Sequence, residues 1–170
     1  QQKSQQREEA AKRRQLREAY QALLAEQRLI TTATKELVGK TVDRRVRFVA
    51  ADLAARQTAM ATKAGEALKT FPDLTKSPTF PIAHTRIEEA ATAAAAKLSS
   101  AEVTAGVVIR QESIARTLEG LLAALKDPDN NEAFRSPEEG GQQGNSGGGN
   151  QPEGLIPSAA ELELLKALQT

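Results

Sequence analysis

Apolar side chains recur at alternating intervals of four and three residues through the first part of the chain. This spacing places them on one face of a helix. The stripe consists of Leu16, Tyr20, Leu23, Gln27, Ile30, Thr34 and Leu37. Residues 1–71 contain no proline and are rich in Ala, Leu, Gln, Glu, Lys and Arg, which are good helix formers. The pattern predicts a first helix over about 4–38.

A second stripe predicts a second helix over about 42–70. Its members are Val42, Val46, Val49, Leu53, Met60, Ala64, Ala67 and Phe71. Arg56 and Gln57 interrupt this stripe. Between the two helices, Gly39 can adopt the left-handed conformation that ends a helix, and Thr41 can cap the start of the next one.

Three prolines separate this first hairpin from the next helical region. Pro72, Pro78 and Pro81 restrict the backbone and remove amide donors, so residues 72–81 are expected to form a connector. The stripe then resumes at Ile87, Ala91, Ala94, Leu98, Ala101, Ala105 and Val108, and a last apolar face follows at Ile114, Leu118, Leu121, Leu122 and Leu125.

The region from residue 82 to residue 126 allows two interpretations. One helix could run over its full length, past Gly106. Alternatively, the first helix ends near Leu98 and another runs over about 100–126. We favour the break, because Ser99-Ser100-Ala101-Glu102 has the pattern of a capping box, in which Ser and Glu bind the first amides of a helix.

The composition changes beyond Asp127-Pro128. Residues 140–154 hold seven of the eleven glycines, which is typical of a flexible linker. A short apolar helix is expected over about 158–168, and a helix of that length needs a surface on which to dock. Its candidate interaction residues are Leu155, Ile156, Leu162, Leu165 and Leu168.

The sequence therefore predicts an all-α protein of antiparallel helical hairpins, forming an elongated, coiled-coil-like bundle with a flexible linker and a short C-terminal helix. The expected segments are an N-terminal helical hairpin (1–71), a Pro-rich connector (72–81), an Ala/Leu-rich helical segment (82–127), a Gly/Gln-rich linker (128–156) and a docking helix (157–170).

The composition leaves few residues for catalysis or metal binding. The chain of 170 residues has no Cys, one His and one Met, so it contains no thiolate ligand or cysteine nucleophile. Val38-Gly39-Lys40-Thr41 is similar to the end of a phosphate-binding loop, but Thr34 stands where the first glycine belongs and no strand precedes it. His84 and Glu88 are one helical turn apart, but Pro81 stands where a di-iron bundle needs Glu. We expect no enzyme activity, no catalytic or metal site and no cofactor.

Charge is balanced overall, with 23 basic and 22 acidic residues, and it is uneven along the chain. Residues 1–126 carry 21 bases and 14 acids, whereas residues 127–170 carry two bases and eight acids. Two basic clusters stand out: Lys12, Arg13, Arg14 and Arg17, and then Lys40, Arg44, Arg45 and Arg47. Acids are interleaved with both, and stacking aromatics are scarce. We therefore interpret them as charged helix faces, and nucleic acid and membrane surfaces are disfavoured partners.

Positions 30 residues apart are alike, which suggests two related helices. Leu23, Ala25, Gln27, Ile30, Glu36 and Leu37 correspond to Leu53, Ala55, Gln57, Met60, Glu66 and Ala67.

This Ala-x-Gln repeat is one of several features that together resemble a protein family. The others are the Pro78-x-Phe80 helix start, the ending Leu118-Glu-Gly-Leu-Leu-Ala-Ala-Leu125, the Gly/Gln linker and the motif Leu155-Ile-Pro-Ser-Ala-Ala-Glu-Leu-Glu-Leu-Leu-Lys-Ala-Leu-Gln169. The order of these features resembles coiled-coil proteins of planctomycete-type bacteria that have no assigned activity. The resemblance implies the helical architecture and an envelope-associated or periplasmic location, and it implies no catalytic residues.

We expect a non-enzymatic scaffold or protein–protein interaction module, with a second copy of the chain or another protein as its partner, and with homo-oligomerisation as one outcome. The alternative function is a peripheral anion-binding module that contacts lipid head groups or nucleic acid through the basic clusters.

Overall fold

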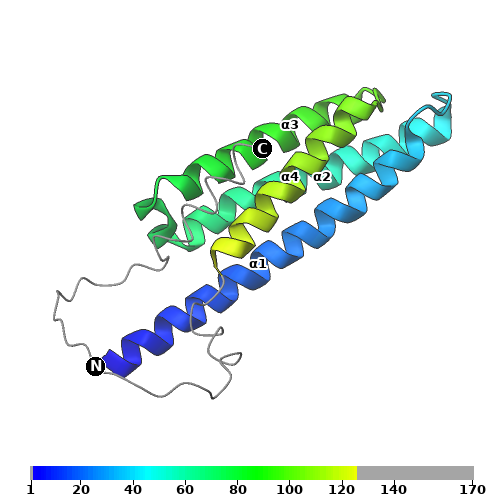
Figure 1. Ribbon diagram of the computed structural model, residues 1–170. Helices are drawn as coiled ribbons and strands as arrows, with labels where there is room; N and C mark the ends of the chain where they lie inside the picture. The colour runs from blue at the N-terminus through cyan, green and yellow to red at the C-terminus, as the bar shows by residue number, and fades with distance from the viewer. Residues whose placement is uncertain (1, 126–170) are drawn as a thin grey trace, which may run out of the picture.

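The computed structural model describes residues 2–125, which form four packed helices (Figure 1). The helices are α1 (Gln2–Leu37), α2 (Arg44–Thr70), α3 (Thr79–Ser99) and α4 (Ala105–Ala124), and a short 3-10 helix, η1 (Pro72–Lys76), lies between α2 and α3. Each long helix packs on two others: α1 on α2 and α4, and α3 on α2 and α4. The prediction of an all-α helical bundle is confirmed.

The predicted stripe of α1 is the buried face of that helix. All seven of its positions are buried, including the polar Gln27 and Thr34. The helix ends at Leu37, and Gly39 follows with a positive φ of 76°. This is the left-handed conformation expected there, which a side chain would disfavour. The first eleven residues or so of α1 are largely exposed and extend beyond the other helices (Figure 1).

The prediction for α2 needs three corrections. The capping residue is Asp43 and not Thr41, since the Asp43 carboxylate accepts a hydrogen bond of 2.8 Å from the Val46 amide. Val42 lies before the helix and is 46% exposed, so it does not belong to the stripe. Gln57, predicted to interrupt the stripe, is fully buried.

Most of the predicted connector, residues 72–81, is helical in the structure. Pro72 opens η1, and Leu74 of η1 is fully buried in the core. α3 begins at Thr79, so Pro81 lies inside its first turn, where a missing amide costs no helical hydrogen bond.

The favoured break between α3 and α4 is confirmed, but the capping box is wrong. The Glu102 amide donates to the Lys97 carbonyl and the Ala101 amide donates to the Leu98 carbonyl. These two bonds are the Schellman motif that ends a helix, with Ala101 in the left-handed region at φ 57°. The Ser-Glu pattern therefore lies at the end of α3, and α4 begins only at Ala105.

The core consists of two hydrophobic clusters, one toward each end of the bundle. The first surrounds Tyr20, Phe80 and Leu118, and the second surrounds Ile30, Leu53 and Leu98. Between them, three glutamines from α1, α2 and α4 meet in the interior. The bundle is therefore apolar at both ends of its core and polar in the middle.

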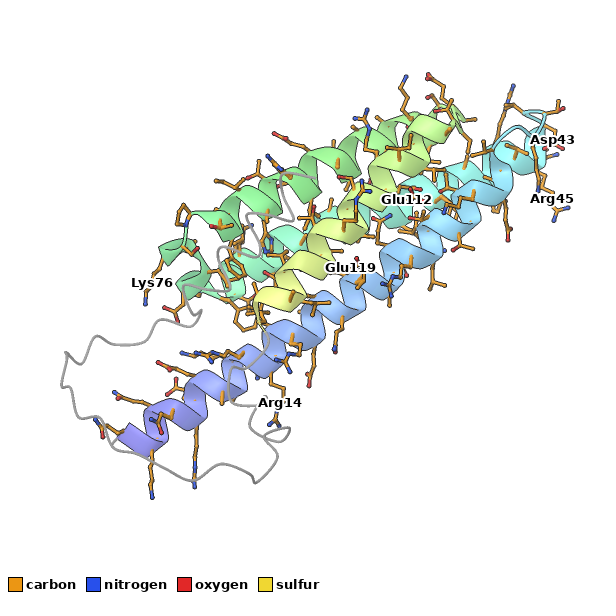
Figure 2. All side chains as sticks on the ribbon, in the orientation of Figure 1. Arg14, Asp43, Arg45, Lys76, Glu112 and Glu119 are labelled. Carbon is orange, nitrogen blue, oxygen red and sulfur yellow. The ribbon has the colours of Figure 1, made fainter. Side chains whose placement is uncertain are left out.

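Ion pairs on the surface follow the register of α1 against α4. Arg28 contacts Glu119 at 2.6 Å, and Lys35 contacts Glu112 at 2.7 Å. From the first pair to the second, the basic residue moves seven positions forward along α1 and the acidic residue moves seven positions backward along α4, as two antiparallel helices require. Glu112 and Glu119 lie along the side of α4 that borders α1 (Figure 2). These exposed pairs each add less than about 1 kcal/mol to stability, so they follow the register more than they set it.

Candidate functional site

The most polar place in the interior is a layer formed by Gln27, Gln57, Gln111 and Thr34, here called the glutamine layer. The Gln57 amide donates to Gln27 at 2.7 Å, and the Gln111 amide donates to both Gln57 and Thr34 at 3.1 Å. All four side chains have no exposed surface. Amides are neither strong acids nor strong bases, so this layer is suited to fixing how the helices align.

Tyr20 and His84 form a second buried polar pair, in the first hydrophobic cluster. The Tyr20 hydroxyl lies 2.6 Å from Nε2 of His84, and Nδ1 of His84 lies 2.9 Å from the Ala64 carbonyl oxygen. A carbonyl only accepts, so Nδ1 carries the proton and Nε2 accepts from the hydroxyl. Burial lowers the pKa of His84 and raises that of Tyr20, so both are neutral near pH 7. The pair joins α1, α2 and α3, and because both side chains are buried, a substrate could reach it only if the bundle opened.

The structure does not bring His84 and Glu88 together as ligands. His84 is buried against Tyr20, whereas Glu88 is exposed on the surface of α3. Within residues 2–125, no three His, Asp or Glu side chains are close enough to hold a metal ion. The segment that is similar to a phosphate-binding loop, Val38-Gly39-Lys40-Thr41, forms the exposed turn between α1 and α2.

A groove of about 340 Å³ lies between α1 and α2, here called the α1–α2 groove. Its walls are mostly small, and Met60 and Leu23, both buried, lie at its base. The polar residues of the groove are the ion pair Glu26–Arg56, at 2.8 Å, and Lys63. The hydrogen bond from Arg56 lowers the pKa of Glu26, so the pair stays ionised. The lining residues are Ala19, Ala22, Leu23, Glu26, Arg56, Ala59, Met60 and Lys63.

A second, more open groove lies between α2 and α3. It is lined only by Ala, Ser and Thr side chains, among them Ala51, Ala55 and Thr92. With no large apolar base and no charged residue in its lining, it offers less to a partner than the α1–α2 groove does.

The second basic cluster lies at the turn between α1 and α2, at one end of the bundle. Residues 38–48, here called the basic tip, contain four basic side chains and one acid. Figure 2 shows Asp43 and Arg45 at this end of the molecule. Phe48 belongs to the same segment and is 76% exposed. The basic tip therefore combines positive charge with exposed apolar surface.

The first basic cluster is partly used inside the fold. Arg17 donates a hydrogen bond of 2.6 Å to the carbonyl of Leu125, and Lys12 pairs with Glu8 one helical turn away. Arg14 points outward from α1 (Figure 2). This cluster therefore acts partly as a structural contact between α1 and the end of α4.

Sequence reasoning missed two features of the candidate site. The glutamine layer was visible only as Gln27 inside the first stripe and as Gln57 interrupting the second, and Gln111 was not singled out. Phe48 was also missed. It does not belong to the apolar stripe of α2, which includes its neighbours Val46 and Val49, and this position already indicated exposure. An aromatic residue beside a stripe and next to three arginines was the available signal.

The predicted interaction residues lie outside the described part of the chain. Leu155, Ile156, Leu162, Leu165 and Leu168 belong to the segment after residue 125, and the structure does not place them.

The internal repeat is reflected in burial: Leu23 and Leu53 are buried, as are Gln27 and Gln57, whereas Ala25 and Ala55 are exposed.

No protein-family model, curated protein or solved structure matches this chain. Among the described residues, none of the helices has the length and apolar character needed to cross a bilayer.

Proposed function

We propose that this protein is a non-enzymatic interaction module, a helical scaffold whose α1–α2 groove binds the apolar segment 155–170 of this same chain. The observation that carries the proposal is the groove itself, which has alanine walls, a Met and Leu base and charged residues among its lining. Small residues along two neighbouring helices leave room for the larger side chains of a third.

The segment 155–170 has the composition that such a groove accepts. Leu162, Leu165 and Leu168 recur at intervals of three, so a helix would present them along one side. Glu161, Glu163 and Lys166 stand beside them, and the groove carries Lys63 in addition to the ion pair Glu26–Arg56. Apolar and charge complementarity therefore agree.

The segment can reach the groove. The described chain ends at Leu125, whose carbonyl accepts a hydrogen bond from Arg17, two residues before the groove residue Ala19. Residues 126–154 span up to about 100 Å when extended. The same segment of a second copy would offer the same chemistry, which would make the protein a self-assembling scaffold.

A cross-linking experiment tests the proposal on the full chain. Because the chain contains no Cys, Ala19→Cys, in the lining of the groove, and Gln169→Cys would supply its only two thiols. We expect rapid disulfide formation between them. A linked monomer identifies binding within one chain, and a linked dimer identifies binding between two copies.

Two further variants serve as controls. The pair Glu88→Cys and Gln169→Cys places the first thiol on the exposed surface of α3 and is expected to cross-link slowly. In the background of the first pair of thiols, Ala22→Leu and Ala59→Leu together would fill the groove, and both positions are exposed. This double replacement is expected to block cross-linking. Ala25→Leu, at an exposed position outside the groove lining, is not expected to block it. Equal cross-linking rates from α3 and from the groove would refute the proposal.

A further inference from the structure

We propose that the basic tip, residues 38–48, is a docking surface for an anionic lipid membrane. This inference is independent of the α1–α2 groove, because it concerns the end of the bundle rather than its side. It rests on exposed apolar side chains, on the direction in which Phe48 points and on the charge around them.

Three large apolar side chains of the basic tip are exposed. Phe48 is 76% exposed, Val42 is 46% exposed and Val38 is 38% exposed. Single exposed apolar residues are common on protein surfaces. Three within eleven successive residues, at the end of an elongated bundle, supply apolar side chains for the boundary between lipid head groups and acyl chains.

The geometry of α2 directs the side chain of Phe48 toward the end of the bundle. α2 begins at Arg44, and helical side chains tilt toward the N-terminus of their helix. Arg44 and Phe48 are one turn apart and therefore lie on the same face. Their side chains lean together toward the turn between α1 and α2, which projects beyond the turn between α3 and α4 (Figure 1).

The charge of the basic tip is strongly positive. Lys40, Arg44, Arg45 and Arg47 are exposed, and Asp43 is the only acid among residues 38–48. The Asp43 carboxylate caps α2 by accepting a hydrogen bond from Val46. Close to the basic tip, Lys35 pairs with Glu112 and Lys97 with Glu102, and Glu36 adds one exposed acid near the end of α1.

This combination favours lipid over nucleic acid. Sequence-independent binding of single strands uses aromatic rings on which successive bases stack, and the basic tip has one exposed ring with two exposed valines. Valine gains nothing from stacking, whereas its burial among acyl chains is favourable. Basic residues around apolar ones are the usual composition of surfaces that bind anionic membranes.

The first test measures binding of the full chain to sedimented phosphatidylcholine vesicles, with and without phosphatidylserine. We expect binding only with phosphatidylserine, and weaker binding as salt rises. The combined variant Arg44→Gln, Arg45→Gln and Arg47→Gln is expected to bind about 100-fold more weakly, at roughly fivefold for each charge. The matched control, Lys3→Gln with Arg7→Gln and Arg14→Gln, removes the same charge from the other end and is expected to bind within about threefold of the unmodified chain.

The second test detects insertion directly. The chain contains no Trp, so Phe48→Trp provides a single fluorophore at the basic tip. We expect a blue shift of its emission on adding phosphatidylserine vesicles. Ile82→Trp, at a position 49% exposed on α3 at the opposite end, is expected to show none.

Three outcomes would overturn the proposal: equal losses of binding from the two charge variants, equal emission changes at the two Trp positions, or no binding to phosphatidylserine vesicles at low salt. Binding to single-stranded DNA that depends on the three arginines, in the absence of vesicle binding, would assign the basic tip to nucleic acid instead.

Discussion

Among residues 2–125, His84 is the side chain whose protonation near neutral pH depends on the fold. Its Nδ1 donates to the Ala64 carbonyl and its Nε2 accepts from Tyr20, so the neutral ring satisfies both partners. A second proton would take away the acceptor that Tyr20 needs and would place a charge in the first hydrophobic cluster. Burial therefore holds the pKa of His84 below its usual value of 6.5.

The sign of the resulting pH dependence follows from this pKa. Below about pH 6.5 the unfolded chain takes up a proton on His84 that the folded chain does not, so unfolding becomes more favourable as pH falls. We expect the free energy of unfolding from urea titration to be level just above pH 6.5, and to fall below it by up to about 1.4 kcal/mol per pH unit until the lower pKa of the folded state is reached.

The matched variant is His84→Gln, because the chain has no other His. It is expected to be less stable at pH 7 through the loss of hydrogen bonds, and to have a flatter profile between about pH 5 and 6.5. Parallel profiles for the two proteins would show that His84 does not cause the dependence.

At the scale of elements, helix ends depend on two residues with positive φ. Gly39 follows α1 at 76°, and Ala101 follows α3 at 57°. Glycine adopts this conformation at little cost, whereas alanine is strained there by about 1 kcal/mol. Gly65 differs from both, since it lies inside α2 with nothing within 4 Å of an added Cβ.

Three substitutions should therefore change stability in opposite directions. Gly39→Ala is expected to lower the free energy of unfolding by about 1 kcal/mol, and Ala101→Gly to raise it by up to about that amount. Gly65→Ala is expected to raise it by about 0.5–1 kcal/mol, because alanine is the better residue inside a helix. Urea unfolding of the three variants measures this, and the same sign at Gly39 and Gly65 would contradict the explanation.

At the scale of the whole molecule, the glutamine layer ties α1, α2 and α4 together at one level of the bundle. Gln57 takes part in bonds to Gln27 and Gln111, whereas Gln111 donates two bonds and its Oε1 has no partner. A buried polar group without a hydrogen-bond partner lowers stability, whereas apolar side chains in the same layer would need no such partners. The layer therefore gives specificity of alignment more than stability.

Replacing one or all of these glutamines should have different effects. Gln57→Leu is expected to cost about 1–3 kcal/mol, since it leaves the buried Oε1 of Gln27 without its donor and removes one of the two acceptors of Gln111, and Gln111→Leu to cost less. The variant in which Leu replaces Gln27, Gln57 and Gln111 is expected to have a free energy of unfolding equal to or above that of the original chain. It is also expected to form a mixture of oligomeric states. Urea unfolding and sedimentation measure the two properties, and a triple variant less stable than Gln57→Leu would be contrary to this expectation.

Much of the fold could be predicted from local patterns. Every position of the first stripe is buried, and the breaks at Gly39 and after Leu98 lie within a few residues of the predicted positions. Helix formation and helix ends depend on neighbours within about four residues, so a single chain segment carries the information. The surfaces were harder to predict, because the exposure of Phe48 and the existence of the α1–α2 groove depend on whether another helix covers those positions.

By itself, then, the sequence determined that residues 2–125 are mostly helical, where the first two helices lie to within a few residues and which faces are apolar, and it favoured the break after Leu98 over one continuous helix. Only the tertiary structure decided which helices are neighbours, that Gln57 meets Gln27 and Gln111 in the interior, that His84 bonds Tyr20, and that the basic tip keeps Phe48 exposed. The physical reason is that helical periodicity is a property of one segment, whereas burial and hydrogen-bond partners of side chains arise from contacts between segments far apart in the chain.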